Sequence, residues 1–187
     1  MLGYVIIIVL LLIYIIIIRK QLGAIQQKLH HLSVTDELTE VYNRRYLISE
    51  LEKYINKSRR HDTDFTLIFL DINDFKSIND TFGHSVGDDI LKILGQTIKN
   101  NLRNYDIGAR YEGDEFLVLL PNTSVADALR IAKRITSEFS TLTYEKTSSE
   151  ITLAFGVISG ENQALEDILI AADEKMYMNK VKKQKLK

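Results

Sequence analysis

The stretch RYEGDEFLVLL, residues 110–120, decides the fold because it joins a tight turn to a buried strand. Its apolar second half predicts a strand that is covered on both faces, and Gly113 predicts the hairpin turn before that strand. Three carboxylates, Glu112, Asp114 and Glu115, therefore gather where the strand begins. Their mutual repulsion raises the free energy of the folded chain unless a cation is present, so the stretch indicates a cation site.

Another carboxylate, Asp71, lies near the end of a second apolar run, FTLIFLDI, at residues 65–72. Asp71 and Asp114 are distant in sequence, so they can meet only if their two strands lie side by side. Two carboxylates at neighbouring strand ends suit Mg²⁺, which binds one or two carboxylates and lets substrate phosphates complete its octahedron. Each aspartate taken alone is better explained as a loop cap, so both interpretations stay open at this point.

Helices and strands alternate over the region that follows residue 35. Ser124 and Asp127 form a capping box, which marks the start of one helix. One pair of strands forms a hairpin, so we expect an α/β (α+β) fold with a mixed sheet, a central hairpin and flanking helices. The predicted helices cover residues 43–61, 86–102, 125–139 and 164–183, and the predicted strands cover residues 65–72, 107–113, 114–121 and 151–159.

The N-terminal stretch is apolar and uncharged from residue 2 to residue 18, and Arg19 and Lys20 follow it at once. This length just spans a bilayer core of about 30 Å, so we expect a transmembrane helix over residues 1–18. The basic residues on its C-terminal side predict that the rest of the chain lies in the cytoplasm, at the inner membrane. A cleaved signal peptide is the alternative, but no basic stretch precedes the apolar run and no small-x-small site follows it.

Residues 19–35 are predicted to form a helical linker. Its apolar residues recur at steps of three and four, as in a heptad seam, which suits a helix that pairs with a copy of itself. A single amphipathic helix has the same pattern, so a homodimer is an expectation and not the only interpretation. The seam residues are Leu22, Ile25, Leu29 and Leu32, and the globular domain is expected over residues 36–187.

Composition narrows the function classes. The chain has no cysteine, which excludes a disulfide framework and a thiolate metal site and agrees with a cytoplasmic location. The formal net charge is −1 at pH 7, so no bulk attraction to nucleic acid is expected.

Three segments, taken together, resemble the GGDEF family, the diguanylate cyclases. They are DELTEVYNRRYL at residues 36–47, LDINDFKSINDTFGHSVGDDIL at residues 70–91 and YEGDEF at residues 111–116. The resemblance extends from residue 36 to about residue 183 and implies the fold of nucleotidyl cyclases and polymerase palms. It implies that two GTP molecules are condensed into cyclic di-GMP with release of pyrophosphate. Because one site holds one GTP, the reaction also implies two facing domains, which a paired stalk would bring together.

The resemblance assigns roles to individual residues. Asp71 and Asp114, with the main-chain carbonyl of Ile72, are the expected ligands of Mg²⁺, with Mn²⁺ as an alternative. Glu115 is the candidate for activating the attacking 3′-hydroxyl. The expected GTP-binding residues are Lys76 and Lys180 for the triphosphate, Asn79 and Asp88 for the guanine edge, and Phe75 and Gly113 beside them.

Chemistry supports the guanine assignment, because a carboxylate at Asp88 can accept hydrogen bonds from N1–H and N2–H₂ of guanine, whereas adenine has no N1–H. An adenylyl-cyclase-like enzyme that uses ATP is disfavoured on the same ground. A lone lysine such as Lys76 is otherwise a solvated surface charge, so only the motif assigns it to phosphate.

A second site is implied by RNYD, residues 103–106, where many members of the family bind their own product as a feedback inhibitor. Arginine suits guanine and phosphate alike, so Arg103 and Asp106 are the expected product-binding residues. An ion pair at a helix end is the competing explanation.

The sequence departs from the family pattern at four positions: Glu112, Asn73, Lys183 and Gln184. Glu112 stands where the signature has its first glycine, and a carboxylate pointing inward would repel the triphosphate. If Gly113 alone supplies the special backbone geometry, Glu112 can instead point to solvent, which we expect. The departure keeps an alternative open, a catalytically weak or inactive domain that serves as a receptor for GTP or cyclic di-GMP.

Overall fold

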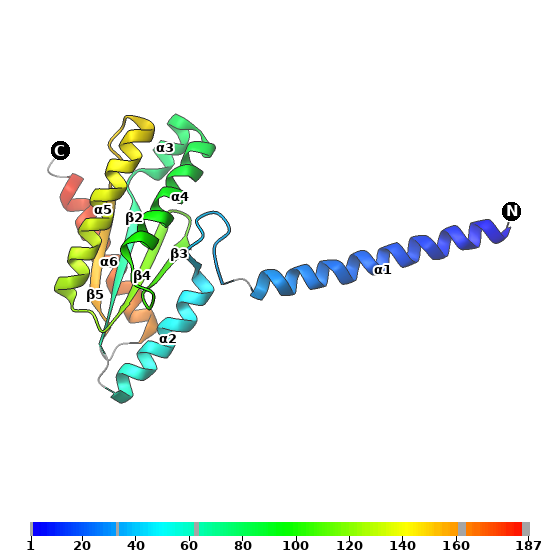
Figure 1. Ribbon diagram of the computed structural model, residues 1–187, viewed down its shortest axis with the longest axis horizontal. Helices are drawn as coiled ribbons and strands as arrows, with labels where there is room; N and C mark the ends of the chain where they lie inside the picture. The colour runs from blue at the N-terminus through cyan, green and yellow to red at the C-terminus, as the bar shows by residue number, and fades with distance from the viewer. Residues whose placement is uncertain (1, 33, 62–63, 161–163, 185–187) are drawn as a thin grey trace. The chain divides into compact units, whose positions relative to one another are not determined.

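The structure is a computed structural model that describes residues 2–32, 34–61, 64–160 and 164–184 (Figure 1). The chain divides into two compact units, Met1–Ser33 and Val34–Lys187.

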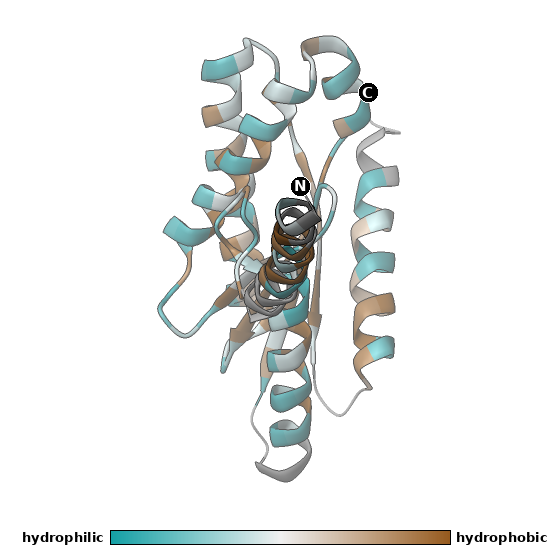
Figure 2. Ribbon diagram, turned by 90° about the vertical axis from the view of Figure 1, so that its right-hand side faces the viewer, coloured by the Kyte–Doolittle hydropathy of each residue, from teal (hydrophilic) through white to brown (hydrophobic). Residues whose placement is uncertain are grey.

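The first unit contains helix α1, Leu2–Leu32. The sequence predicts a transmembrane helix over residues 1–18, and the structure does not support it: within the described part of the chain, no helix is both long enough and apolar enough to cross a bilayer. Helix α1 does not end with its apolar stretch (brown in Figure 2) but continues past the charged Arg19 and Lys20. Of the predicted heptad seam, Leu22 is exposed, and the side chains of Ile25, Leu29 and Leu32 lie outside those that the structure describes.

The second unit is built on a five-stranded sheet with strand order β1-β3-β4-β2-β5. Strand β1 is parallel to β3, and the other neighbours are antiparallel. The predicted mixed sheet with a central hairpin, β3–β4, is therefore confirmed. The strands are β1 (Tyr42–Asn43), β2 (Phe65–Ile72), β3 (Ile107–Glu112), β4 (Glu115–Pro121) and β5 (Leu153–Ser159).

Helices cover both faces of this sheet. Helices α4 and α5 pack on one face, and α2 and α6 pack on the other (Figure 1). The short α3 follows β2 and leads into α4. The helices are α2 (Arg44–His61), α3 (Phe75–Phe82), α4 (His84–Asn101), α5 (Val125–Thr147) and α6 (Leu165–Gln184). Helix α5 begins at the predicted capping box, where the Ser124 hydroxyl accepts a hydrogen bond from the Asp127 backbone N–H.

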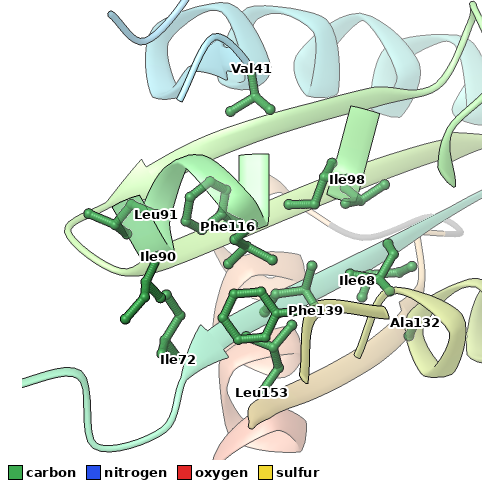
Figure 3. Close-up of a cluster of buried hydrophobic side chains, with 14 of the residues drawn as sticks. Val41, Ile68, Ile72, Ile90, Leu91, Ile98, Phe116, Ala132, Phe139 and Leu153 are labelled. Atoms are coloured by element: carbon green, nitrogen blue, oxygen red, sulfur yellow. The ribbon is translucent and has the colours of Figure 1, made fainter. Parts of the chain in front are cut away.

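Two hydrophobic cores result from the alternation of side chains along the strands. On β2, Ile68, Leu70 and Ile72 join the core under α4 and α5, which Figure 3 shows around Phe116 and Phe139. The intervening β2 residues face α2 and α6. Asp71 follows Leu70 and so belongs to the face covered by α6. Every residue of β2 is buried, which predicts that the position of this strand end is firmly fixed.

Candidate active site

The end of β2 and the start of β4 bring three carboxylates together. In the antiparallel pairing of these strands, Asp71 lies opposite Glu115, and Asp114 immediately precedes β4. The condition set by the sequence, that the two strands lie side by side, is therefore confirmed. Like charges directly opposite each other on neighbouring strands are destabilising, and Asp71 is only 8% exposed, so water screens this repulsion poorly.

The electrostatics of these carboxylates reflect this crowding. Burial raises the pKa of Asp114, and the negative charge of Asp71 raises it further. Burial also raises the pKa of Glu115, followed by the charges of Asp71, Asp173 and Asp114. A cation bound here would relieve the repulsion, and carboxylate oxygens are the ligands that Mg²⁺ prefers, so the donor set fits this ion.

The predicted ligand set has only two carboxylate side chains, Asp71 and Asp114, besides the Ile72 carbonyl. The described residues include no group of three or more His, Cys, Asp or Glu side chains arranged to hold a metal ion. A magnesium ion at this site would therefore need oxygen ligands from substrate phosphates, as this ion commonly does in nucleotide-binding sites.

Lys180 reaches the same strand end from helix α6. Its Nζ lies 2.6 Å from Oδ1 of Asp71, and the two side chains are 28% and 11% exposed. Lys180 is predicted to bind the triphosphate, whereas the structure pairs it with an expected metal ligand. The contact joins residues that are far apart in the sequence, so no local pattern predicts it.

The hairpin turn explains how the chain accommodates Glu112. Gly113 has a positive φ of 51°, and Glu112 does not have a positive φ. The Glu112 side chain is 72% exposed and forms an ion pair with Arg44, at 3.3 Å between Oε2 and Nη1. The expectation that Gly113 alone supplies the special geometry and Glu112 points to solvent is confirmed. The sequence did not predict that Arg44 is the partner of Glu112. The guanidinium carbon of Arg44 also lies 4.3 Å from the centre of the Tyr111 ring.

The residues predicted to bind guanine come from α3 and the start of α4. A Cβ added to Gly87 would lie 1.9 Å from Oδ1 of Asn79 and 3.4 Å from the Phe75 ring, so glycine is needed for this close packing. Asn79 is thereby held against the residue that precedes Asp88. Asp88 itself is exposed, so the structure brings these two predicted residues to one place and leaves the carboxylate accessible.

Lys76, the other predicted phosphate ligand, also lies on α3, which begins three residues after β2 ends. It is exposed and forms no ion pair with any residue that the structure describes. Lys76 and Lys180 therefore flank the β2 end from different helices, and only Lys180 is engaged by a carboxylate.

Asn73, a departure from the family pattern, has a structural contact that the sequence did not predict. Its side-chain amide donates to the Thr152 hydroxyl at 2.8 Å, and its backbone N–H donates to the Thr152 carbonyl at 3.0 Å. These bonds tie the segment after β2 to the segment before β5. Asn73 thus stabilises the loop that connects Ile72 to α3.

The predicted product site is a polar cavity between the end of α4 and the start of α5. Asp106 is 8% exposed, and its Oδ2 accepts a hydrogen bond from the Arg103 backbone N–H at 2.9 Å. Burial raises the pKa of Asp106. The Arg103 guanidinium donates instead to the Tyr105 hydroxyl at 2.8 Å. The Asp106 carboxylate is therefore bound by the Arg103 main chain and not by its side chain. The structure does not show the competing explanation, a helix-end ion pair between the two side chains.

This cavity, of about 560 Å³, is also lined by two arginines from α5, Arg130 and Arg134. Sequence reasoning missed both. Their spacing of four residues on a predicted helix places them on one face, which is the signal that could have indicated them. Among the buried side-chain atoms that the structure describes, Oδ1 of Asp106 alone lacks a hydrogen-bond partner. Arg130 pairs with Asp127, and Arg134 donates to the side-chain and main-chain oxygens of Asn101, so both guanidiniums already have protein partners.

Comparison with known proteins identifies the family. Residues 33–186 match the family model for the diguanylate cyclase, GGDEF domain. The chain belongs to the GGDEF family. The response regulator PleD of Caulobacter vibrioides (strain NA1000 / CB15N) is 38% identical over 155 residues, which cover 80% of this chain and 34% of PleD. The probable diguanylate cyclase DgcC of Escherichia coli (strain K12) is 36% identical over 137 residues, 73% of this chain and 37% of DgcC.

Solved structures agree with this family. The coiled coil and GGDEF domain of DgcB from Caulobacter crescentus, in complex with c-di-GMP, has a TM-score of 0.76 at 25% identity, covering 86% of this chain and 87% of that chain. Diguanylate cyclase SiaD from Pseudomonas aeruginosa, in complex with its activator SiaC, has a TM-score of 0.75 at 30% identity, covering 88% of this chain and 64% of that chain. The chain spans about a third of the length of PleD and DgcC.

Proposed function

We propose that this chain is a diguanylate cyclase that condenses two GTP molecules into cyclic di-GMP and pyrophosphate. The observation that carries the proposal is the register of β2 and β4, which sets Asp71 opposite Glu115 and beside Asp114 at one end of the sheet. Family membership supports it, because relatives that cover most of this chain are described as diguanylate cyclases.

The carboxylates of the site are assigned two roles, metal binding and proton transfer. Asp71, Asp114 and the Ile72 carbonyl would hold Mg²⁺ (or Mn²⁺), which supplies Lewis-acid stabilisation of the phosphate oxygens when bound. Glu115, which lies opposite Asp71 on β4, would accept the proton of the attacking 3′-hydroxyl.

Substrate recognition is assigned to the α3–α4 side of the site. Asn79 and Asp88 bind the guanine edge, Phe75 packs beside them, and Lys76 binds phosphate as an exposed point charge. Gly113 has no side chain, and no atom lies within 4 Å of the position that a Cβ would occupy there, so the space beside the hairpin turn is open. A phosphate can therefore approach the turn backbone.

We propose that the active form is a homodimer, because each site holds one GTP and the reaction needs two. The predicted heptad seam would raise the effective concentration of the second half-site. The similarity to a solved DgcB structure that contains a coiled coil beside its GGDEF domain supports this arrangement. The location at the cytoplasmic membrane stays a prediction.

The test is to incubate the purified full chain with GTP and Mg²⁺ and to follow cyclic di-GMP by mass spectrometry. We expect a product that accumulates with time and is absent for Asp114→Asn. If no product forms while cyclic di-GMP binds, the receptor function is correct instead. The cavity beside Arg103 and Asp106 is compatible with that second candidate as well, since it would bind cyclic di-GMP whether or not the domain is catalytic.

A further inference from the structure

Lys180 contacts a residue that it would have to release during the proposed reaction. Its ammonium lies 2.6 Å from Oδ1 of Asp71, within hydrogen-bond distance, and Asp71 is almost fully buried. Both residues are assigned to the substrate complex, Asp71 to the metal and Lys180 to the triphosphate. One carboxylate therefore has two competing cationic partners.

Helix α6 is fixed firmly enough to keep this lysine at the strand end. A Cβ added to Gly156 of β5 would lie 2.4 Å from the Ala172 carbonyl, so the helix backbone packs directly on the strand. Two α6 side chains, Lys175 and Asn179, donate to the carbonyls of Val157 and Phe155 at 3.2 and 2.7 Å. The helix thus holds the backbone of Lys180 in place, and the flexible side chain can exchange partners.

The charge of Lys180 reaches beyond Asp71. It lowers the pKa of Asp114, against the raising effects of burial and of Asp71. Lys180 therefore balances part of the negative charge that a metal ion would otherwise have to balance. Lys76 differs from it in this respect, because Lys76 is exposed and has no ion pair with any described residue.

We propose that Lys180 is a placeholder for the metal ion: it neutralises Asp71 in the nucleotide-free protein and transfers to the triphosphate when Mg²⁺ and GTP enter together. The inference rests on the proposed function. A divalent ion alone has to displace a charged hydrogen bond and leave the lysine without a partner, so it binds weakly. A triphosphate supplies the new partner, so metal and nucleotide bind cooperatively.

The experiment measures Mn²⁺ binding to the nucleotide-free full chain, from the electron paramagnetic resonance signal of free Mn²⁺, for wild type and Lys180→Gln. We expect the variant to bind Mn²⁺ about tenfold more tightly, a change of about 1.4 kcal/mol. Repeating the titration with a non-reacting GTP analogue should show the opposite order, because the variant has lost a phosphate ligand.

Two further variants serve as controls. Lys133→Gln makes the same substitution at an exposed lysine of α5, on the sheet face opposite to α6, so its Mn²⁺ affinity should equal that of the wild type. Lys180→Arg keeps the cation and should bind Mn²⁺ as weakly as the wild type, even if Lys180→Gln fails to fold.

Unchanged or weaker Mn²⁺ binding by Lys180→Gln overturns the inference, as does tighter binding by Lys180→Arg if Lys180→Gln is unfolded. The proposed function is tested separately by the wild type with nucleotide. If wild type binds no Mn²⁺ even with the GTP analogue, the metal site itself is wrong and the placeholder role is lost with it.

Discussion

Replacing Glu112 with glycine restores the family signature and shows whether the natural turn limits catalysis. The structure places the Glu112 carboxylate in solvent, 72% exposed and paired with Arg44 at 3.3 Å. Although Glu112 pairs with Glu115 across the hairpin, its carboxylate lies in solvent and is balanced by a guanidinium. We expect kcat/KM of Glu112→Gly to change by less than about tenfold, which corresponds to about 1.4 kcal/mol of transition-state stabilisation.

Stability should fall modestly in the same variant, for two reasons. Glycine at the end of β3 loses about 0.5–1 kcal/mol through backbone entropy. The exposed ion pair with Arg44 contributes about 0.2–1 kcal/mol, because both side chains are largely hydrated. The free energy of unfolding, measured in urea without metal, should therefore drop by about 0.7–2 kcal/mol.

Glu112→Gln is the matched control, because it removes the charge and keeps the side chain. Glu112 also contributes to the raised pKa of Glu115, so both variants should shift the acidic limb of the pH–rate profile slightly to lower pH. A gain in kcat/KM of about a hundredfold or more for Glu112→Gly would refute this reasoning. It would show that the carboxylate acts on bound phosphates and that the natural chain is impaired at its turn, which would favour the receptor function.

Three other variants test the remaining assignments. Asp114→Asn should abolish cyclic di-GMP synthesis, and its melting temperature in metal-free buffer at neutral pH should equal or exceed that of the wild type. Burial and Asp71 raise the pKa of Asp114, so the wild type loses stability as the pH rises through that raised pKa. The neutral variant does not lose stability in this way. Near-normal synthesis by this variant would show that the metal assignment is wrong. Arg103→Ala should leave the initial rate unchanged, and its progress curve should flatten less than that of the wild type as product accumulates. Identical curves for the two proteins would rule out feedback inhibition at this cavity. Asp88→Ser should reduce the preference for GTP over ATP in a competition assay, and an unchanged preference would show that guanine is recognised elsewhere.

The sequence predicted those parts of the fold that depend on local periodicity. Strand β2 was predicted over the residues that form it, and the β3–β4 hairpin follows from one glycine between two apolar runs. Strand β1 was not predicted, because two residues are too few for an alternating pattern. Helix α3 was not predicted either, since its eight residues contain a single buried one, Ile78.

The site was predicted in part, for a related reason. The motif named the carboxylates, and the β2–β4 register then placed them together. The sequence did not predict the cationic partners of these carboxylates, because Lys180 and Asp71 are 109 residues apart and Arg44 and Glu112 are 68 residues apart. Such contacts depend on how α6 and α2 pack on the sheet, and no pattern along the chain encodes them. The predicted transmembrane helix is the one element that the described structure does not support.

The carboxylates at the β2 end are tolerated because the strands that carry them are stabilised elsewhere. Strands β2 and β4 pair along seven positions, of which only the last, Asp71 with Glu115, sets two carboxylates opposite each other. The other positions of both strands are buried. Burying one apolar side chain contributes about 1.5–3 kcal/mol, so several such residues outweigh one unfavourable charged pair. The unfavourable charge is thus held in a rigid position, where a cation can lower its energy. Lys180 neutralises part of this negative charge. The negative charge that is left would attract the metal ion that the proposed reaction needs.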